Sequence, residues 1–278
     1  MEALDFMRYV PAFARKQMEP KAASRWLLEN RVRTYNARPG GDDGTGIRCP
    51  VCLDRGNLAF IPEGEERMVI RPCECLPRRR TALRLRQCGM LERAKECTLP
   101  RFRTDTPMQK AMKEAALRYL DDDTGAWFAC CGQSGAGKTH LCTAIFVRLV
   151  ADRGLEGEYM IWGPALRRIK SELYAGGEAL LERYKRAPLL YVDDLFKGEE
   201  GKPLSDADLR LAFELIDHRY NNRLRTVLST ERAAEQLAQL DQAVAGRIRE
   251  RCGPYLINIA PEPEKNYRFR GGEFRSKN

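Results

Sequence analysis

The hydrophobic and polar positions of this chain follow two different periods from about residue 100 onward. Between Met108 and Tyr119, apolar residues recur every three or four positions, and this spacing predicts a helix with one apolar face. Elsewhere the apolar residues stand in short continuous runs, which predict strands buried on both sides. The predicted strands lie at residues 126–131, 158–162, 189–192, 226–229 and 255–259, and further helices lie at 138–152, 165–174, 205–220 and 233–251. Strands that alternate with helices indicate an α/β fold in which a parallel sheet is flanked by helices.

The first hundred residues have a different pattern, which predicts a separate and smaller part of the molecule. A segment rich in Pro, Gly and Asp at 38–46 predicts a loop, because these residues favour turns over helices and strands. The other predicted elements are a helix at 22–33, a small hairpin built from strand-like runs at 57–61 and 67–71, and a basic helix from Arg78 onward. We therefore divide the chain into an N-terminal region, residues 1–97, and a larger domain, residues 98–278.

A glycine-rich segment joins the predicted strand 126–131 to the helix 138–152. It matches the pattern G-x-x-x-x-G-K-[ST] at every fixed position, in the strand-to-helix context that this phosphate-binding loop requires. Glycine lets the backbone turn its N–H groups toward a phosphate, and the helix N-terminus adds a favourable dipole. We expect Lys138 to meet the β and γ phosphates of ATP and the Thr139 hydroxyl to bind Mg²⁺. The predicted nucleotide-binding residues are Gly132, Gln133, Ser134, Gly135, Ala136, Gly137, Lys138 and Thr139.

An acidic pair, Asp193 and Asp194, follows the predicted strand at 189–192. Mg²⁺ prefers oxygen ligands, and a carboxylate held at the end of a strand is a suitable one. The pair lies about 55 residues after Lys138, a separation that suits the second half of a nucleotide site. We therefore expect Asp193 to hold the ion and Asp194 to polarise the attacking water, as in a Walker B element. The alternative is a solvated Asp-Asp loop after a core strand.

Four cysteines of the N-terminal region stand in two close pairs. A C-x-x-C pair and a C-x-C pair, with twenty residues between them, are formed by Cys49, Cys52, Cys73 and Cys75. Four thiolates at this spacing are the ligands that tetrahedral Zn²⁺ takes in structural sites. The sequence therefore predicts a zinc module at about residues 49–75. Cys88 is a possible substitute ligand, and four unliganded thiols are the alternative to a metal site.

The composition of the 278 residues limits the classes of protein that fit. The 48 basic residues outnumber the 39 acidic ones, and the net charge of +9 favours a polyanionic partner such as nucleic acid. No apolar run approaches the roughly 18 residues needed to cross a bilayer, and the first residues do not resemble a signal peptide. Six of the ten cysteines are scattered, which fits a reducing compartment better than a disulfide scaffold. We expect a cytoplasmic protein with no membrane partner.

The order of four features along the chain resembles a known family. They are the loop at 132–139, the Asp193-Asp194 pair, the segment Thr226–Arg232 and the segment Gly246–Arg251. Over about residues 98–270 they resemble the AAA+ ATPase domain of DnaC-type bacterial and phage helicase loaders, which are relatives of the initiator DnaA and the transposition helper IstB. The resemblance implies an ATPase that uses Mg²⁺. An aspartate at 194, where AAA+ enzymes more usually have glutamate, implies slow hydrolysis.

The same resemblance implies two further site roles. In the family, the strand after the Walker B element ends in a polar sensor of the γ-phosphate, which here would be Ser229, Thr230 or Glu231. The family's arginine finger lies in a motif like Ser-Arg-Leu, which implies Arg247, with Arg251 as the second candidate. A guanidinium from a neighbouring subunit neutralises charge that develops on the transferred phosphoryl group, so hydrolysis would depend on self-association. The alternative is that these arginines form a solvated helical face or a nucleic-acid contact.

A zinc module ahead of an ATPase domain also resembles the DnaI-like branch of helicase loaders, in which the N-terminal region grips the replicative helicase. The resemblance thus implies an ATP-dependent loader that binds a DnaB-type replicative helicase through residues 1–97 and delivers it to single-stranded DNA. We expect the basic residues at 78–86 and 247–251 to follow the DNA phosphates. Two alternatives stay open. One is an IstB-like ATPase that assists transposition on duplex DNA, and the other is a zinc-bearing adaptor that nucleotide binding switches with negligible turnover.

Overall fold

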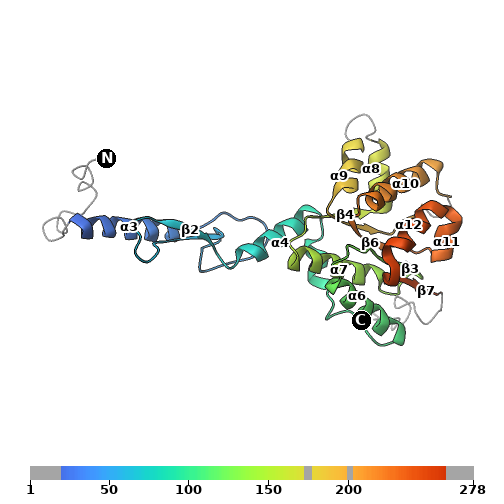
Figure 1. Cartoon of the computed structure of the whole chain (residues 1–278), viewed down its shortest axis with the longest axis horizontal. Coiled ribbons are helices and arrows are strands. Elements are labelled where there is room, and N and C mark those ends of the chain that lie inside the picture. The colour runs from blue at the N-terminus through green and yellow to red at the C-terminus, as the bar shows by residue number, and fades with distance from the viewer. Residues whose placement is uncertain (1–19, 172–176, 199–202, 261–278) are drawn as a thin grey trace, which may run out of the picture. The chain divides into compact units, whose positions relative to one another are not determined.

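The computed structural model describes residues 20–171, 177–198 and 203–260. They group into two compact units, which divide between Leu83 and Arg84. The N-terminal unit contains a long helix and a two-stranded antiparallel hairpin, as the sequence predicts (Figure 1). Its elements are α3 (Pro20–Ala37), β1 (Asn57–Phe60), β2 (Val69–Pro72) and the first turns of α4 (Leu76–Gln87). The Asn36 side-chain amide joins α3 to the hairpin, because it donates to the Ala59 carbonyl and accepts from the Ala59 N–H at 2.9 and 2.8 Å.

The second unit is built on a parallel sheet of five strands in the order β4-β5-β6-β3-β7 (Figure 1). The strands are β3 (Phe128–Gly132), β4 (Gly157–Ile161), β5 (Leu189–Asp193), β6 (Arg225–Ser229) and β7 (Leu256–Ile259). A helix lies in every crossover between consecutive strands, as parallel pairing requires. The predicted α/β architecture is therefore confirmed, and β3, which leads into the glycine-rich loop, is an interior strand.

Helices cover both faces of this sheet. On one face are α6 (Pro107–Asp121) and α7 (Lys138–Asp152), with the short helix α5 (Leu91–Glu96) packed against α7. The helices of the other face are α8 (Trp162–Ser171), α9 (Gly177–Arg186), α10 (Asp206–Asn221), α11 (Ala234–Leu240) and α12 (Gln242–Cys252).

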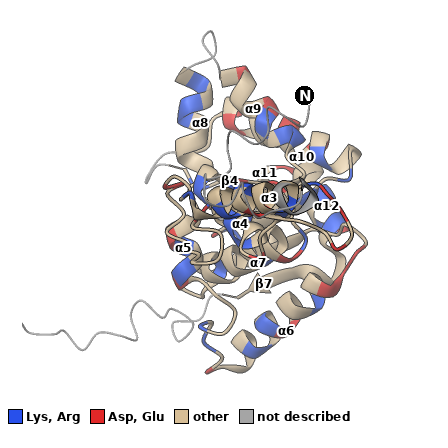
Figure 2. Ribbon diagram, turned by 90° about the vertical axis from the view of Figure 1, so that its left-hand side faces the viewer, with Lys and Arg blue, Asp and Glu red and all other residues tan. Residues whose placement is uncertain are grey.

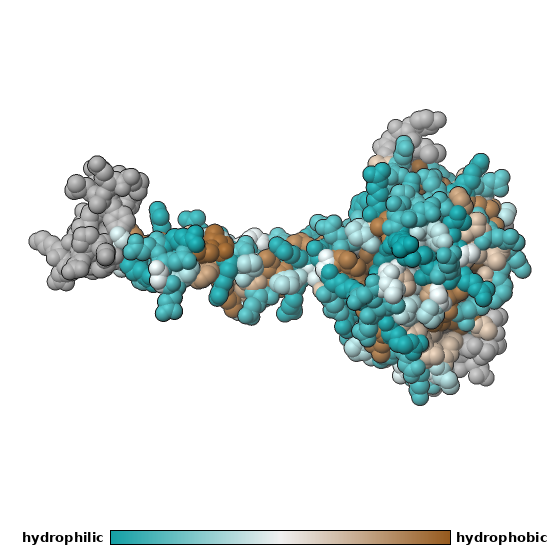
Figure 3. All heavy atoms as spheres, viewed as in Figure 1, coloured by the Kyte–Doolittle hydropathy of each residue, from teal (hydrophilic) through white to brown (hydrophobic). Residues whose placement is uncertain are grey.

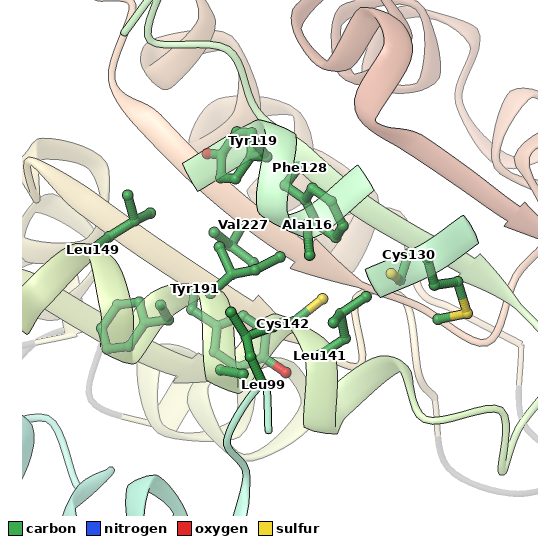
Figure 4. Packing of buried hydrophobic residues seen from close by; sticks show 14 of the residues in the cluster. Leu99, Ala116, Tyr119, Phe128, Cys130, Leu141, Cys142, Leu149, Tyr191 and Val227 are labelled. Carbon is green, nitrogen blue, oxygen red and sulfur yellow. The ribbon is translucent and has the colours of Figure 1, made fainter. Parts of the chain in front are cut away.

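Two hydrophobic cores result, and β3 contributes alternate residues to each. Phe128 and Cys130 enter the core shared with α6 and α7, whereas Ala129 and Cys131 enter the core beneath α8 to α12. This division follows from the strand geometry, in which successive side chains point to opposite faces. Figure 4 shows the first core, where Tyr119 of α6 lies beside Phe128, and their ring centroids are 5.2 Å apart.

The prediction of one helix over 233–251 was wrong, because the chain breaks at Asp241. Asp241 has extended backbone angles, φ −155° and ψ 107°, and its carboxylate accepts hydrogen bonds from the N–H groups of Ala243 and Val244. An aspartate that satisfies free N–H groups in this way starts a new helix. The short helix α5 and the helix α9 were not predicted.

On the face drawn in Figure 3, hydrophilic residues predominate and hydrophobic residues form small groups. None of the helices in the described ranges is long and apolar enough to cross a membrane.

Candidate functional site

The glycine-rich loop lies between the end of β3 and the start of α7, in the predicted context. Gly132 has a φ of +100°, and a Cβ at this position would lie 2.1 Å from the Ile259 carbonyl oxygen of the neighbouring strand. Gly135 and Gly137 have φ values of +76° and +90°. Glycine adopts such angles readily and other residues do not, so the fixed glycines of the motif give the loop its curved backbone.

Lys138 begins α7 and lies within this loop. Its ammonium donates to the carbonyl oxygens of Gly132 and Gln133 at 2.7 Å each. Burial lowers the pKa of Lys138, while the negative charge of Glu231 acts in the opposite direction. A buried cation within a glycine-rich loop at the start of a helix is suited to meet phosphates.

Thr139 and Asp193, predicted as the magnesium pair, are in contact. The Thr139 hydroxyl donates to Oδ1 of Asp193 at 3.1 Å, although the two residues lie 54 positions apart in the sequence. Hydroxyl and carboxylate oxygens are ligands that Mg²⁺ accepts, so one ion could contact both or reach Asp193 through water. Their proximity results from the pairing of β5 with β6 and of β6 with β3, which brings the end of β5 close to the start of α7.

Several hydroxyl groups keep the buried Asp193 carboxylate ionised. Burial would raise the pKa of Asp193, but hydrogen bonds from Ser229, Tyr159, Tyr191 and Thr139 hold it below the usual value. The Ser229, Tyr191 and Tyr159 hydroxyls lie 2.5, 2.9 and 2.8 Å from the carboxylate oxygens. Sequence reasoning missed both tyrosines. Tyr191 could have been found, since it lies two positions before Asp193 on the same face of one strand.

The three sensor candidates occupy different positions. Ser229 contacts Asp193 and also accepts the Asp194 N–H at 3.1 Å, while the Thr230 hydroxyl is buried against the Leu195 carbonyl at 2.7 Å. Burial would raise the pKa of Glu231, but a hydrogen bond from Ser134 of the loop and the charge of Lys197 lower it. Glu231 is thus the candidate that reaches the glycine-rich loop, and its role as a sensor stays a prediction.

Asp194, the predicted water-activating residue, directly follows β5. Its backbone has a φ of +59°, in the left-handed region, so its side chain leaves the strand in a different direction from that of Asp193. Lys197 Nζ lies 3.0 Å from the Asp194 carboxylate and 3.3 Å from that of Glu231. The structure therefore brings Asp194 and Glu231 to one shared cation.

The arginine-finger candidates on α12 contact their own chain. Arg247 forms an ion pair with Asp217 at 2.6 Å, and its guanidinium lies 5.0 Å from the Phe213 ring centroid. Arg251 donates to the Gly125 carbonyl at 2.8 Å. Arg249, between them, is exposed. Action of Arg247 or Arg251 on a neighbouring subunit stays a prediction.

The four predicted zinc ligands form one cluster. All four Sγ atoms lie within 4.8 Å of one another, with 3.9 Å between Cys49 and Cys73 and 3.4 Å between Cys52 and Cys75. Sulfurs at about 2.3 Å from a tetrahedral Zn²⁺ would be about 3.8 Å apart, so the cluster fits this ion. Backbone N–H groups lower the pKa of the Cys49 thiol to about 7, whereas burial and the neighbouring thiols raise that of Cys75 to about 12.

Two residues, Cys88 and Arg79, differ from their expected roles. Cys88 lies outside it, with its thiol donating to the Leu85 carbonyl at 3.4 Å. Arg79 was expected to follow DNA phosphates but is only 4% exposed, because its guanidinium pairs with Asp43 and Asp54 at 2.5 Å each. Arg78, the neighbouring arginine of α4, is exposed. Figure 2 shows Lys and Arg in blue on the ribbon, and α4 is one of the elements that carry them.

Comparisons with known sequences place the chain among ATP-binding proteins. The profile of the family described as IstB-like ATP binding protein matches residues 77–252. Protein XkdC of the phage-like element PBSX of Bacillus subtilis (strain 168) is 30% identical over 244 residues, which cover 84% of this chain and 91% of that protein. An ATP-binding protein of insertion sequence IS232 from Bacillus thuringiensis subsp. berliner is 29% identical over 130 residues, or 46% of this chain and 49% of that protein.

Comparisons with solved structures concern the fold. The DnaC helicase loader has a TM-score of 0.54 and 23% identity, with 61% of this chain and 99% of that chain covered. A DNA replication initiation factor has a TM-score of 0.50 and 19% identity, with 63% of this chain and 53% of that chain covered.

Proposed function

Since the chain belongs to the family of IstB-like ATP-binding proteins and has the AAA+ fold, we propose that it is an ATP-dependent loader of a DnaB-type replicative helicase. The ATP-binding part of this proposal rests on the contact between Thr139 and Asp193. It brings together the two proposed magnesium ligands, one at the glycine-rich loop and the other at the end of β5. The loop N–H groups would cradle the phosphates, Lys138 would bind the β and γ phosphates, and Asp194 would orient the attacking water. Mg²⁺ held at this pair would neutralise charge on the phosphates.

The cysteine-containing N-terminal module favours a helicase loader over an ATPase that has no partner-binding region. The four cysteines lie before residue 77, outside the part of the chain that matches the family profile. A unit folded around Zn²⁺ gains much of its stability from the metal and offers a rigid surface on few residues. We assign residues 1–97 to helicase binding and the ATPase domain to single-stranded DNA, in a cytoplasmic protein whose subunits associate through their ATPase domains.

A second function is favoured by a specific observation. The matching profile is that of IstB-like proteins, and one relative belongs to an insertion sequence. A transposition ATPase would assemble on long duplex DNA, whereas a loader would prefer single strands. Salt titration on both DNA forms measures this preference, because phosphate contacts make either affinity fall steeply with salt.

The direct test is a loading assay on a circular single strand. The helicase of the same replication system is incubated with the protein and ATP, and unwinding of an annealed oligonucleotide is measured. We expect the wild type to support unwinding and Lys138→Ala and Asp193→Asn to fail. Unwinding that does not depend on the protein would refute the loader. ATP binding without Asp194-dependent hydrolysis in any of these mixtures would instead indicate a nucleotide-switched adaptor.

A further inference from the structure

An arginine outside all of the nucleotide motifs contacts the expected magnesium ligand. Arg93, on the short helix α5, places Nη1 3.1 Å from Oδ2 of Asp193 and 2.5 Å from the Tyr159 hydroxyl. Its guanidinium also lies 5.5 Å from the Tyr159 ring centroid. Nothing in the spacing of the sequence indicates this contact, since Arg93 and Asp193 lie 100 positions apart.

The partners of Asp193 are divided between its two oxygens. Oδ1 accepts from the hydroxyls of Thr139, Tyr191 and Ser229, and Oδ2 accepts from Tyr159 and Arg93. Four hydroxyls already fix the orientation of the carboxylate. The distinct contribution of Arg93 is therefore its charge, and within the described residues it is the cation paired with Asp193.

A guanidinium and Mg²⁺ on one carboxylate repel each other. The single negative charge of Asp193 cannot compensate both a monovalent and a divalent cation, so each should weaken the binding of the other. Replacing Arg93 with a neutral residue should therefore lower the Mg²⁺ concentration needed for half-saturation by on the order of tenfold. This factor corresponds to the repulsion expected between the two cations a few ångström apart in a water-like dielectric.

The repulsion between Mg²⁺ and Arg93 also affects how firmly α5 is attached to the ATPase unit. The helix spans only Leu91–Glu96, contains no buried residue and has no side-chain cap at Met90. Leu91 and Ala94 are partly buried against the core, and the ion pair between Arg93 and Asp193 adds a polar contact that holds the middle of α5 to the ATPase unit. By linkage, Mg²⁺ weakens this attachment by the same factor by which Arg93 weakens Mg²⁺ binding.

We propose that Arg93 is a latch: it ties α5 to Asp193 and is loosened when magnesium-bound nucleotide occupies the site. This inference rests on the proposed ATP site and adds a route by which that site reaches the N-terminal module. The route along the chain is short, since α5 follows α4 directly and α4 begins one residue after Cys75. The nucleotide state thus changes the C-terminal end of the region assigned to helicase binding.

The test uses full-length protein and a fluorescent ATP analogue, first with chelator and then with rising Mg²⁺. Arg93→Gln removes the charge, Arg93→Lys keeps it, and Lys95→Gln is the matched control, because exposed Lys95 lies on the same helix and pairs with Glu92. We expect Arg93→Gln to need about tenfold less Mg²⁺ for half-saturation, while wild type, Arg93→Lys and Lys95→Gln agree within about twofold.

Hydrogen exchange of residues 91–97 gives a second readout that does not depend on turnover. In nucleotide-bound wild type and Lys95→Gln, added Mg²⁺ should speed exchange in this segment, whereas Arg93→Gln should exchange fast with or without it. An Arg93→Gln protein that needs as much Mg²⁺ as wild type or more, or exchange at 91–97 that ignores Mg²⁺, would overturn the latch and leave the ATP site standing. Failure of the wild type to bind nucleotide would reject both the latch and the proposed function.

Discussion

Asp193 illustrates how a carboxylate can be both buried and charged. Its surroundings provide hydroxyl donors from three strands and one helix, and each donor stabilises the ionised form. The folded pKa of Asp193 therefore lies below the unfolded value. This difference contributes stability above the unfolded pKa, and the contribution is lost as the pH falls through the folded pKa.

Replacing Ser229 with alanine removes one of these donors. Ser229→Ala should destabilise the protein by about 1.5–3 kcal/mol at neutral pH, the usual range for a hydrogen bond to a charged group. Denaturant unfolding measures the loss, with Ser171→Ala as control because the Ser171 hydroxyl donates to the Arg168 carbonyl on the exposed surface. The difference from wild type should shrink in acid, where Asp193 is protonated, and an undiminished difference would contradict the role assigned to the charge.

Arg79 plays a comparable part beside the cysteine cluster. Burial would lower the pKa of Arg79, but Asp43, Cys75 and Asp54 raise it, so the guanidinium stays charged next to the thiols. Asp54 in turn accepts the Cys49 N–H at 2.7 Å. Arg79 thereby links the two cysteine pairs and would offset the negative charge that four thiolates would bring to Zn²⁺.

We expect Arg79→Met to weaken zinc binding by about 10–100-fold, the usual effect of losing an outer partner of a metal site. Competition with a chromogenic chelator measures the affinity. Arg78→Met, at the exposed neighbouring position, should bind zinc as the wild type does. Equal zinc affinities for the two variants would show that the Arg79 network is dispensable for the metal.

Among the elements, the second face of the sheet is tied together by a buried arginine. Arg219 of α10 is 0% exposed and donates to the Tyr184 and Ala187 carbonyls before β5 and to the Arg225 carbonyl of β6. Burial lowers the pKa of Arg219 to about 9. Among the described residues, the cation is held by backbone carbonyl oxygens and by the Thr226 hydroxyl at 2.9 Å.

Arg219→Leu should therefore cost about 3–5 kcal/mol of stability, since the buried carbonyls lose their donors. Thermal unfolding compares this variant with Arg210→Leu, an exposed position on the same helix. A melting temperature within one degree or so of wild type would mean that water replaces the lost donors.

The strands were predictable and some helices were not, for physical reasons. A strand covered on both faces needs an apolar run, and Leu189–Val192 has one, so its position can be read directly. Asp241 interrupts an otherwise helical pattern because its side chain caps the start of α12. The sequence alone does not distinguish such a capping aspartate from one that is merely solvated. α5 is six residues long and rests on the core through tertiary contacts, which local periodicity does not contain.

The same distinction applies to the site. The glycine loop, Thr139 and Asp193 follow from motif spacing, because the chemistry of phosphate and Mg²⁺ requires those residue types in that order. Arg93 and Tyr159 reach Asp193 only through the packing of α5 and the register of β4 beside β5, which pairs Ile161 with Asp193. Such contacts become visible only in the structure.

For the molecule as a whole, hydrolysis should depend on assembly. If Arg247 acts on a neighbouring subunit, ATP turnover per subunit rises with protein concentration, and Arg247→Ala lowers it by about 10³-fold or more while nucleotide binding persists. Steady-state hydrolysis over a dilution series checks this, with Arg249→Ala as the exposed control on the same helix. If Arg247→Ala hydrolyses ATP at the wild-type rate, Arg247 is not the arginine finger. The finger would then be Arg251, or neither of these two arginines.

Complex formation with the replicative helicase is the decisive measurement for the proposed loader. Native mass measurement compares the full-length protein with a chain that begins at Arg84, which removes the N-terminal unit and keeps α5 on the ATPase unit. We expect a defined complex in the presence of ATP and Mg²⁺ that is lost on truncation. Absence of a complex from full-length protein with zinc and ATP bound would contradict the loader and favour the transposition ATPase.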